Sequence, residues 1–278
     1  MQARPQPQFR GRTWRVPLAA LLLAAGALWP QAAVPQPSSP VPSQPADRAA
    51  LDVLVGELYD FELVWAVTTA GLKQSVLREF ERGFELMAKE QRATLPEPAR
   101  AKTRAASAAV VDQAFAKRDR LAELRAATRD LYAERFSGED LAAIRAHATS
   151  PGGKRAIAGG NVQLAREAKR SILDAPAVAK DPLPPMHGEA EQRYFADYAA
   201  RRPPGDALSA EARASVTQFR QSDLGRRLGQ ANLDVLLIGR RIGDAALRED
   251  GVQYRFFTIA GQSLKEAGVT MVLPGAKP

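Results

Sequence analysis

The chain has 278 residues and contains no cysteine. This excludes a disulfide-stapled scaffold, a metal site with thiolate ligands, a cysteine nucleophile and a lipid anchor attached to cysteine. Histidine occurs only 2 times, and aromatic residues make up only 6% of the chain. With 45% hydrophobic and 25% charged residues, the remainder is typical of a globular protein. Length and composition therefore predict one or two domains with a buried core.

Familiar catalytic and phosphate-binding motifs are also missing. There is no Gly-x-Ser-x-Gly turn. The run Gly152-Gly153-Lys154 is only superficially similar to a phosphate loop, because the full Gly-x-x-x-x-Gly-Lys-Ser/Thr spacing is absent. A zinc site would need both histidines, His147 and His187, together with carboxylates such as Glu189 and Glu191. The histidines lie far apart in the sequence, so we expect no metal and no cofactor.

A single apolar run, residues 16–29, lies near the N-terminus. Arginines precede it and no acidic residue does, and it is shorter than the roughly 20 residues that cross a bilayer. This pattern predicts a secretory signal peptide over residues 1–33, cleaved after Gln31-Ala32-Ala33. Cleavage at Ala25-Gly26-Ala27 and an uncleaved N-terminal anchor are the alternatives. Because no twin-arginine pair is present, we expect export to the periplasm by the general secretion route.

Residues 34–46 consist only of Pro, Ser, Gln, Ala and Val. Such a segment has few backbone donors and little apolar surface to bury, which predicts a disordered tether. Removing residues 1–33 removes 4 Arg and no acidic residue, so the net charge falls from +8 to +4. This small excess does not indicate nucleic-acid binding, and we expect membrane contact only through the signal segment.

Beyond the tether, the chain is rich in Ala, Leu, Arg and Glu, which favour helix. Apolar residues recur at helical spacing, and the one segment with strand character, Gln253–Ile259, is still expected to be helical. Prolines at positions 96 and 98, and again at 176–185, predict breaks between helices. We therefore predict an all-α bundle of about eight to ten helices. It comprises a helical domain over residues 47–175 and a second helical segment, residues 176–278, packed on the first.

Two stretches, residues 137–155 and 209–227, align without gaps at a shift of 72 positions. In each copy a serine is placed to cap a first helix, and a second serine to cap the next. A glycine three residues after the second serine would allow the two helices to approach closely. The identical pairs are Ser137/Ser209, Glu139/Glu211, Ala142/Ala214, Ser150/Ser222, Gly153/Gly225 and Arg155/Arg227. Either a helical hairpin is duplicated, or two capped helix pairs in an Ala-rich chain resemble each other by chance.

The first copy also carries a resemblance to a known family. Residues 131–137 (Leu-Tyr-Ala-Glu-Arg-Phe-Ser), then Glu139-Asp140-Leu141, then Ser150-Pro151-Gly152-Gly153-Lys154 resemble the bacterial family called domain of unknown function 2059. The resemblance covers about residues 50–175, with a degenerate second copy over 208–240. It implies an exported helical protein and offers no catalytic residues. The chain departs from the family pattern at Ala146-His147-Ala148, where Phe and Tyr are usual.

Basic residues follow the second helix start in each copy. They are Lys154 and Arg155 in the first copy and Arg226 and Arg227 in the second, with Arg240-Arg241 further on. If the copies pack side by side, these cations would form an anion-binding patch near two helix N-termini, suited to a lipid phosphate or another envelope polyanion. The alternative is a solvated helix face whose cations pair with neighbouring Asp and Glu.

Together these features predict an exported periplasmic protein that binds an envelope component or an anionic ligand without catalysing a reaction. The alternative is a hydrolase with an unrecognised site around Tyr132, Glu134 or His147. Packing in the helical core also explains Tyr132 and His147. A deep polar pocket lined by these side chains would favour the hydrolase, whereas an apolar groove between helices would favour binding of a lipid or peptide.

Overall fold

The computed structural model describes residues 48–90, 95–116, 119–174, 187–202 and 209–268. Within these ranges it contains ten α-helices, one π-helical segment and no strand, which confirms the predicted all-α bundle. The predicted signal peptide, the tether and the Pro-rich break at 176–185 lie outside the described residues. The elements are α2 (Arg48–Leu58), α3 (Phe61–Glu90), α4 (Glu97–Phe115), α5 (Arg120–Arg135), α6 (Gly138–Thr149), α7 (Pro151–Ala168), η1 (Lys169–Asp174), α9 (Glu189–Ala200), α10 (Ala210–Gln221), α11 (Asp223–Glu249) and α12 (Val252–Glu266).

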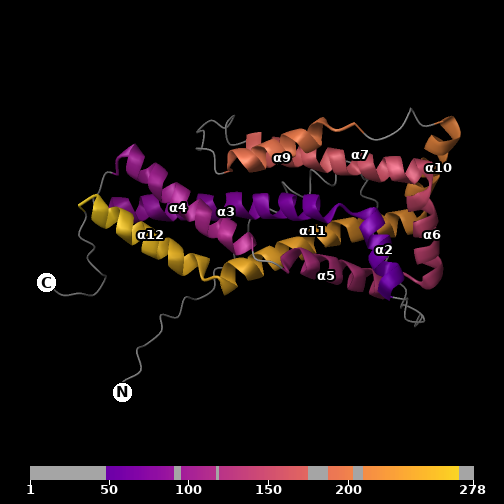
Figure 1. The fold of residues 1–278 in the computed structure, drawn as a ribbon, viewed down its shortest axis with the longest axis horizontal. Coiled ribbons are helices and arrows are strands. Elements are labelled where there is room, and N and C mark those ends of the chain that lie inside the picture. Colours follow the sequence, from indigo (N-terminus) through magenta and orange to yellow (C-terminus); the bar gives the residue numbers. More distant parts are fainter. Residues whose placement is uncertain (1–47, 91–94, 117–118, 175–186, 203–208, 269–278) are drawn as a thin grey trace, which may run out of the picture.

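The molecule is elongated, and α3 and α11 run along its length (Figure 1). The pair α4 and α12 forms one end, and α6 and α10 form the other. Helices α7 and α9 pack on each other and make a layer along one side of α3. Since α11 packs on α3 and α5, and α12 packs on α4, the helices of the two predicted segments share one packed body.

The apolar core is organised around α3. This 30-residue helix contributes side chains to each of four buried clusters. Phe61 and Val64 pack with α2, α5, α6 and α11, while Leu72 and Leu77 pack with α4, α11 and α12. Leu63 packs against α7 and α9. Because neighbours cover α3 on several sides, polar residues in its middle must find partners inside the protein.

Helix boundaries follow the sequence signals closely. The break predicted around residues 95–98 precedes α4, which begins at Glu97 with a proline in its first turn. The helix expected from Pro151 to about residue 173 forms and continues through Gly159-Gly160. It ends as an α-helix at Ala168 and continues as the π-helical segment η1. The segment Gln253–Ile259 lies within α12 and is helical, as expected.

The two copies of the hairpin have the same local structure. Ser150 Oγ accepts a hydrogen bond from Gly153 N (3.0 Å) and donates one to His147 O (2.7 Å). In the second copy, Ser222 Oγ accepts from Gly225 N (3.1 Å) and donates to Phe219 O (2.6 Å). Each serine therefore closes the end of one helix and caps the start of the next, as the repeat predicted.

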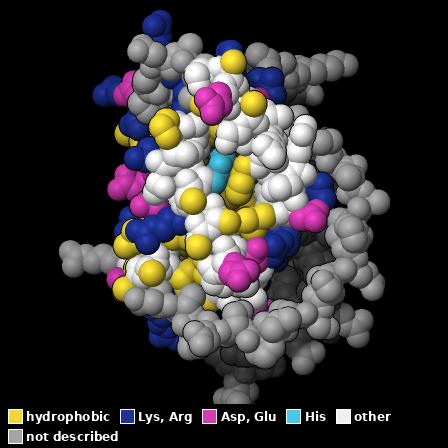
Figure 2. Space-filling model, turned by 90° about the vertical axis from the view of Figure 1, so that its right-hand side faces the viewer, with side chains coloured by type: hydrophobic (Ala, Val, Ile, Leu, Met, Phe, Trp, Pro, Cys, Tyr) yellow, Lys and Arg dark blue, Asp and Glu magenta, His cyan; other side chains and the backbone are white. Residues whose placement is uncertain are grey.

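The copies also meet at equivalent positions. His147 in α6 and Phe219 in α10 are 72 residues apart, and their rings stack at 3.8 Å with an interplanar angle of 7°. Figure 2 shows this end of the molecule, where a histidine lies beside hydrophobic side chains. The expected role of His147 as a helix-packing residue agrees with this contact.

Candidate functional site

An open pocket of about 320 Å³ lies between α3, the first turn of α5 and α9, and its walls are mostly apolar. Its volume is at the lower end of the range for small-molecule sites. Residues from α3 form one side, Leu121 of α5 another, and residues from the first half of α9 the third. The lining residues are Glu62, Trp65, Ala66, Thr69, Leu121, Glu191, Tyr194 and Phe195.

Helical spacing places the lining residues on common faces. Glu62, Trp65 and Thr69 are three and four residues apart on α3, so they lie one above the other. The Thr69 hydroxyl donates to Trp65 O (2.8 Å), so it is satisfied within its own helix. On α9, Glu191 and Tyr194 are related by the same spacing.

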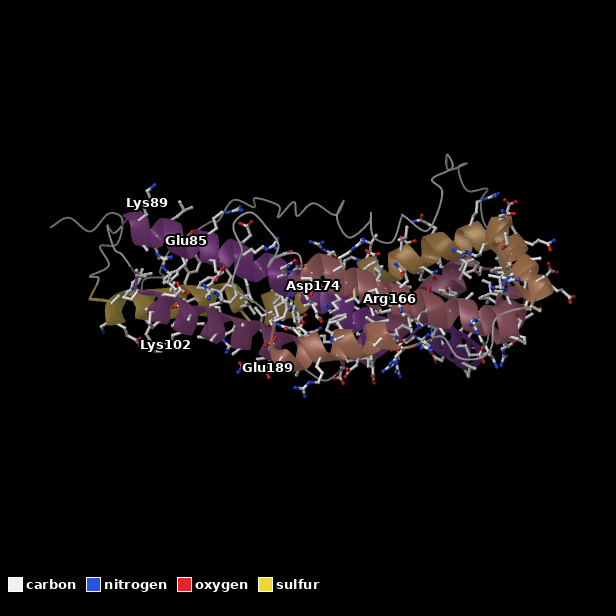
Figure 3. All side chains as sticks on the ribbon, turned by 90° about the horizontal axis from the view of Figure 1, so that it is seen from above. Glu85, Lys89, Lys102, Arg166, Asp174 and Glu189 are labelled. Atoms are coloured by element: carbon white, nitrogen blue, oxygen red, sulfur yellow. The ribbon has the colours of Figure 1, made fainter. Side chains whose placement is uncertain are left out.

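Contacts behind the pocket fix its aromatic rings. Trp65 packs edge-on against Phe115 with ring centroids 6.1 Å apart. Tyr194 makes a similar edge-on contact with Phe195 at 5.5 Å. The far end of α9 is tied to α7, because Arg166 Nε donates to the carbonyl oxygen of Ala199 (2.9 Å). Figure 3 shows this layer from above, with Arg166 on α7 and Glu189 at the start of α9. These contacts pack the walls of the pocket against the neighbouring helices.

A charge network centred on the buried Lys73 adjoins the pocket at Glu191. Lys73, in the middle of α3, is only 4% exposed. Its Nζ lies 2.6 Å from Asp112 Oδ1 and 3.3 Å from Glu191 Oε2, so it joins α3 to both α4 and α9. The neighbouring Gln74 is also buried and donates from Nε2 to Ile172 O (2.5 Å). These pairings satisfy the polar side chains that α3 carries into the core.

The second contact of Glu191 is with His187, the buried histidine that precedes α9. His187 Nδ1 lies 3.0 Å from Glu191 Oε2. Burial alone would raise the pKa of Glu191, but its contacts with His187 and Lys73 outweigh burial and lower that pKa. Across the described part of the chain, no group of three or more His, Asp and Glu side chains is placed to hold a metal ion.

Negative charge is concentrated at the mouth of the pocket. Glu62 is exposed and pairs with no cation among the described residues. Burial, followed by the charges of Asp60 and Glu62, raises the pKa of Tyr194 to about 12. Asp60 itself accepts hydrogen bonds from the Tyr198 hydroxyl (2.8 Å) and from Leu63 N (3.0 Å). The negative charges of Asp60 and Glu62 therefore act on the phenol of Tyr194 more strongly than the positive charge of Arg201 does.

No protein-family model matches this chain, and comparison with curated proteins and with solved structures found no similar chain. The pocket must therefore be interpreted from its own geometry. None of the helices that the structure describes has the length and hydropathy needed to span a bilayer.

The residues predicted to bind an anion lie at the two hairpin corners, away from this pocket. Arg227 donates to both carboxylate oxygens of Asp140, at 2.7 and 3.0 Å, and its guanidinium lies 5.6 Å from the ring centroid of Phe136. The hydrogen bonds from Arg227, with those of the helix cap, lower the pKa of Asp140. Asp140 therefore has two roles: it pairs with Arg227, and it accepts a hydrogen bond from Ser137 N in the capping box of α6.

The remaining cations of that patch have different surroundings. Arg226 pairs with Asp223 and donates to Gln221 O (3.0 Å) at the end of α10. Lys154 is exposed on α7, and Arg155 is half-buried. An anion at this end would compete with Asp140 and Asp223 for the two arginines of the second copy. The anion-binding patch stays a prediction.

The residues considered for a hydrolase do not form a shared cluster. Tyr132 is fully buried and its hydroxyl lies 2.8 Å from that of Tyr59. His147 stacks on Phe219 at the end of the bundle, and Glu134 is exposed. Burial raises the pKa of the Tyr132 hydroxyl, which makes it a poorer acid than a free phenol. The hydroxyl of Tyr132 therefore lies in the core, apart from the other two residues.

Proposed function

We propose that this chain is an exported periplasmic binding protein and that the pocket between α3, α5 and α9 is its ligand site. The observation that carries the proposal is the mostly apolar pocket lined by aromatic rings and two carboxylates. Among its lining residues, Thr69 carries the only aliphatic hydroxyl, and that hydroxyl donates to a backbone carbonyl of its own helix. A nucleophile with an adjacent base, which a hydrolase needs, is not found among these residues.

Export is the second part of the proposal. It is supported by the basic residues before the apolar run of residues 16–29, by the tether of residues 34–46, and by the resemblance to the family called domain of unknown function 2059. N-terminal sequencing of the protein from the periplasmic fraction of an expressing bacterium tests it. The expected first residue is Val34, and cleavage at the alternative site would give Leu28. Full-length protein confined to the cytoplasm would contradict export.

Ligand binding is tested with Nile red, a neutral dye whose emission rises in apolar surroundings. The wild-type chain should bind the dye saturably. In Ala66→Phe the larger ring would occupy the pocket, so dye emission should fall several-fold. The matched control is Ala142→Phe, which adds the same ring at an exposed position of α6 and should leave binding unchanged. If both variants bind the dye like the wild type, the pocket is not the site.

A further inference from the structure

The pocket combines aromatic walls with uncompensated carboxylate charge, and this combination has a chemical consequence. We infer that it selects an organic cation, an amine or quaternary ammonium group carried on a small apolar body. This inference rests on the proposed binding function and adds the ligand class. The first support is aromatic: Trp65, Tyr194 and Phe195 all line the pocket. The face of an aromatic ring attracts a cation, and tryptophan does so most strongly.

The second support is the balance of charge around the pocket. The α3 wall contributes Glu62, which has no ion-pair partner in the described ranges, and the α9 wall contributes Glu191. The nearby cations are already engaged. Lys73 contacts Asp112 and Glu191 from beneath the surface, and it is only 4% exposed. An incoming cation would therefore meet a carboxylate without displacing an existing partner.

The same neighbourhood already contains a cation held by an aromatic ring. The guanidinium carbon of Arg201, just after α9, lies 4.0 Å from the ring centroid of Tyr198. At the start of α3, the ring centroid of Phe61 lies 5.5 Å from the guanidinium carbon of Arg125 in α5. Both rings lie outside the pocket lining.

An anion would be repelled by the same groups. Glu62 and Glu191 both line the pocket. Beyond the larger effect of burial, the charges of Asp60 and Glu62 raise the pKa of Tyr194 against the opposing charge of Arg201. A neutral ligand would gain the apolar contact but not the attraction to the rings and the carboxylate. A cation, a neutral molecule and an anion of the same shape should therefore bind the pocket with different affinities.

The experiment uses three probes of nearly the same shape: choline, its neutral carbon isostere 3,3-dimethylbutan-1-ol, and the anion 3,3-dimethylbutanoate. The full chain carries Trp14→Phe and Trp29→Phe, which leaves Trp65 as the sole tryptophan of the 3 in the sequence. Emission from Trp65 then reports on the pocket whether or not the leader is cleaved. Saturation transfer from the protein to the ligand methyl protons provides an independent measure of binding.

We expect choline to bind about tenfold more tightly than the neutral alcohol, and the anion not to bind. High salt should reduce the preference, because Glu62 is exposed. If alcohol and choline bind equally, the pocket binds ligands but the inference about charge is wrong. If the anion binds best, the inference is also wrong. If none of the probes binds and Nile red does not bind either, the proposed function fails as well.

Two variants test which residues cause the preference for choline over the neutral alcohol. Glu62→Gln should weaken choline binding several-fold and leave the alcohol unaffected, whereas Tyr194→Leu should weaken choline more than the alcohol. Glu62 lies in the first turn of α3, where its charge also suits the helix dipole. The matched control is therefore Glu139→Gln, an exposed carboxylate in the first turn of α6, which should not change choline binding. Equal effects of the two Glu→Gln variants would refute the role of Glu62.

Discussion

The glycines at the two hairpin corners provide the sharpest test of the fold. A Cβ atom on Gly153 would lie 1.8 Å from the carbonyl oxygen of His147, and one on Gly225 would lie 2.0 Å from that of Phe219. Both neighbours are backbone atoms, so neither can move aside by changing a rotamer. We therefore expect Gly153→Ala and Gly225→Ala to force the first helix of each hairpin away from the second.

The expected cost follows from what must shift. Relieving the overlap requires a backbone movement of more than about 1 Å, and overpacking of this kind costs about 1 to 3 kcal/mol. The movement also strains the capping bond from Gly153 N to Ser150 Oγ (3.0 Å), and caps contribute about 1 kcal/mol. Alanine regains up to about 1 kcal/mol through its better helix propensity. The net loss should be about 1 to 3 kcal/mol for each substitution.

Urea denaturation followed by circular dichroism measures this loss as a shift of the midpoint at constant slope. The matched control is Gly160→Ala in the same helix, α7, where no atom lies within 4 Å of the added Cβ. That change should be stabilising by about 0.5 to 1 kcal/mol. If Gly153→Ala is as stable as Gly160→Ala, the close approach at the corner is not real.

Three further predictions concern buried polar groups. The Tyr59 hydroxyl lies 2.8 Å from the Tyr132 hydroxyl and donates to Asn232 Oδ1 (2.6 Å). Because Tyr59 makes two hydrogen bonds and Tyr132 one of them, Tyr59→Phe should cost about 2 kcal/mol of stability and Tyr132→Phe about 1 kcal/mol in urea denaturation. Additive losses in the double variant would disprove the network. Lys73→Met should cost about 2 kcal/mol at pH 7, because it removes the buried cation that Asp112 and Glu191 share and leaves Glu191 with His187 alone. The loss should be smaller in acid, where a protonated Glu191 no longer needs the cation; equal losses at pH 7 and in acid would indicate lost packing instead. Burial lowers the pKa of His147. Wild-type stability should therefore fall as the pH drops below about 6.5, where the unfolded chain binds a proton first. Thermal melts should show that His147→Phe removes this pH dependence, and a difference in melting temperature between the two proteins that does not change with pH would refute the prediction.

Much of the fold could be predicted from the sequence because it depends on local signals. The serines at 137, 150, 209 and 222 cap helices at the positions expected from their spacing. Prolines mark the helix start at α4 in the same way. Such signals act within a few residues, so the chain displays them directly. The π-helical segment η1 carries no comparable signal, which is why an ordinary helix was expected there.

The pocket could not be predicted in the same way. Trp65 and Tyr194 are 129 positions apart, and only the packing of α9 along α7 brings them to one cavity. A partial signal existed in α3, where Lys73 and Gln74 interrupt an otherwise apolar stretch. Two polar residues in such a position must have buried partners or face solvent. The sequence does not distinguish these outcomes, because it does not contain the identity of the neighbours.

The two hairpin copies show why charge at a repeat is harder to interpret than its turns. Gly153 and Gly225 occupy matching environments because the atoms nearest to an added Cβ at each position belong to its own hairpin. Arg155 and Arg227 also match in sequence, but Arg227 reaches Asp140 in the other copy, and the residue equivalent to Asp140 is Ala212. An ion pair between Arg155 and position 212 is therefore not possible. Backbone geometry is preserved between the copies, whereas the pair of Arg227 with Asp140 cannot recur at the equivalent positions. A patch of cations inferred from repeat symmetry therefore has to be examined one arginine at a time, because side-chain partners need not repeat when backbone geometry does.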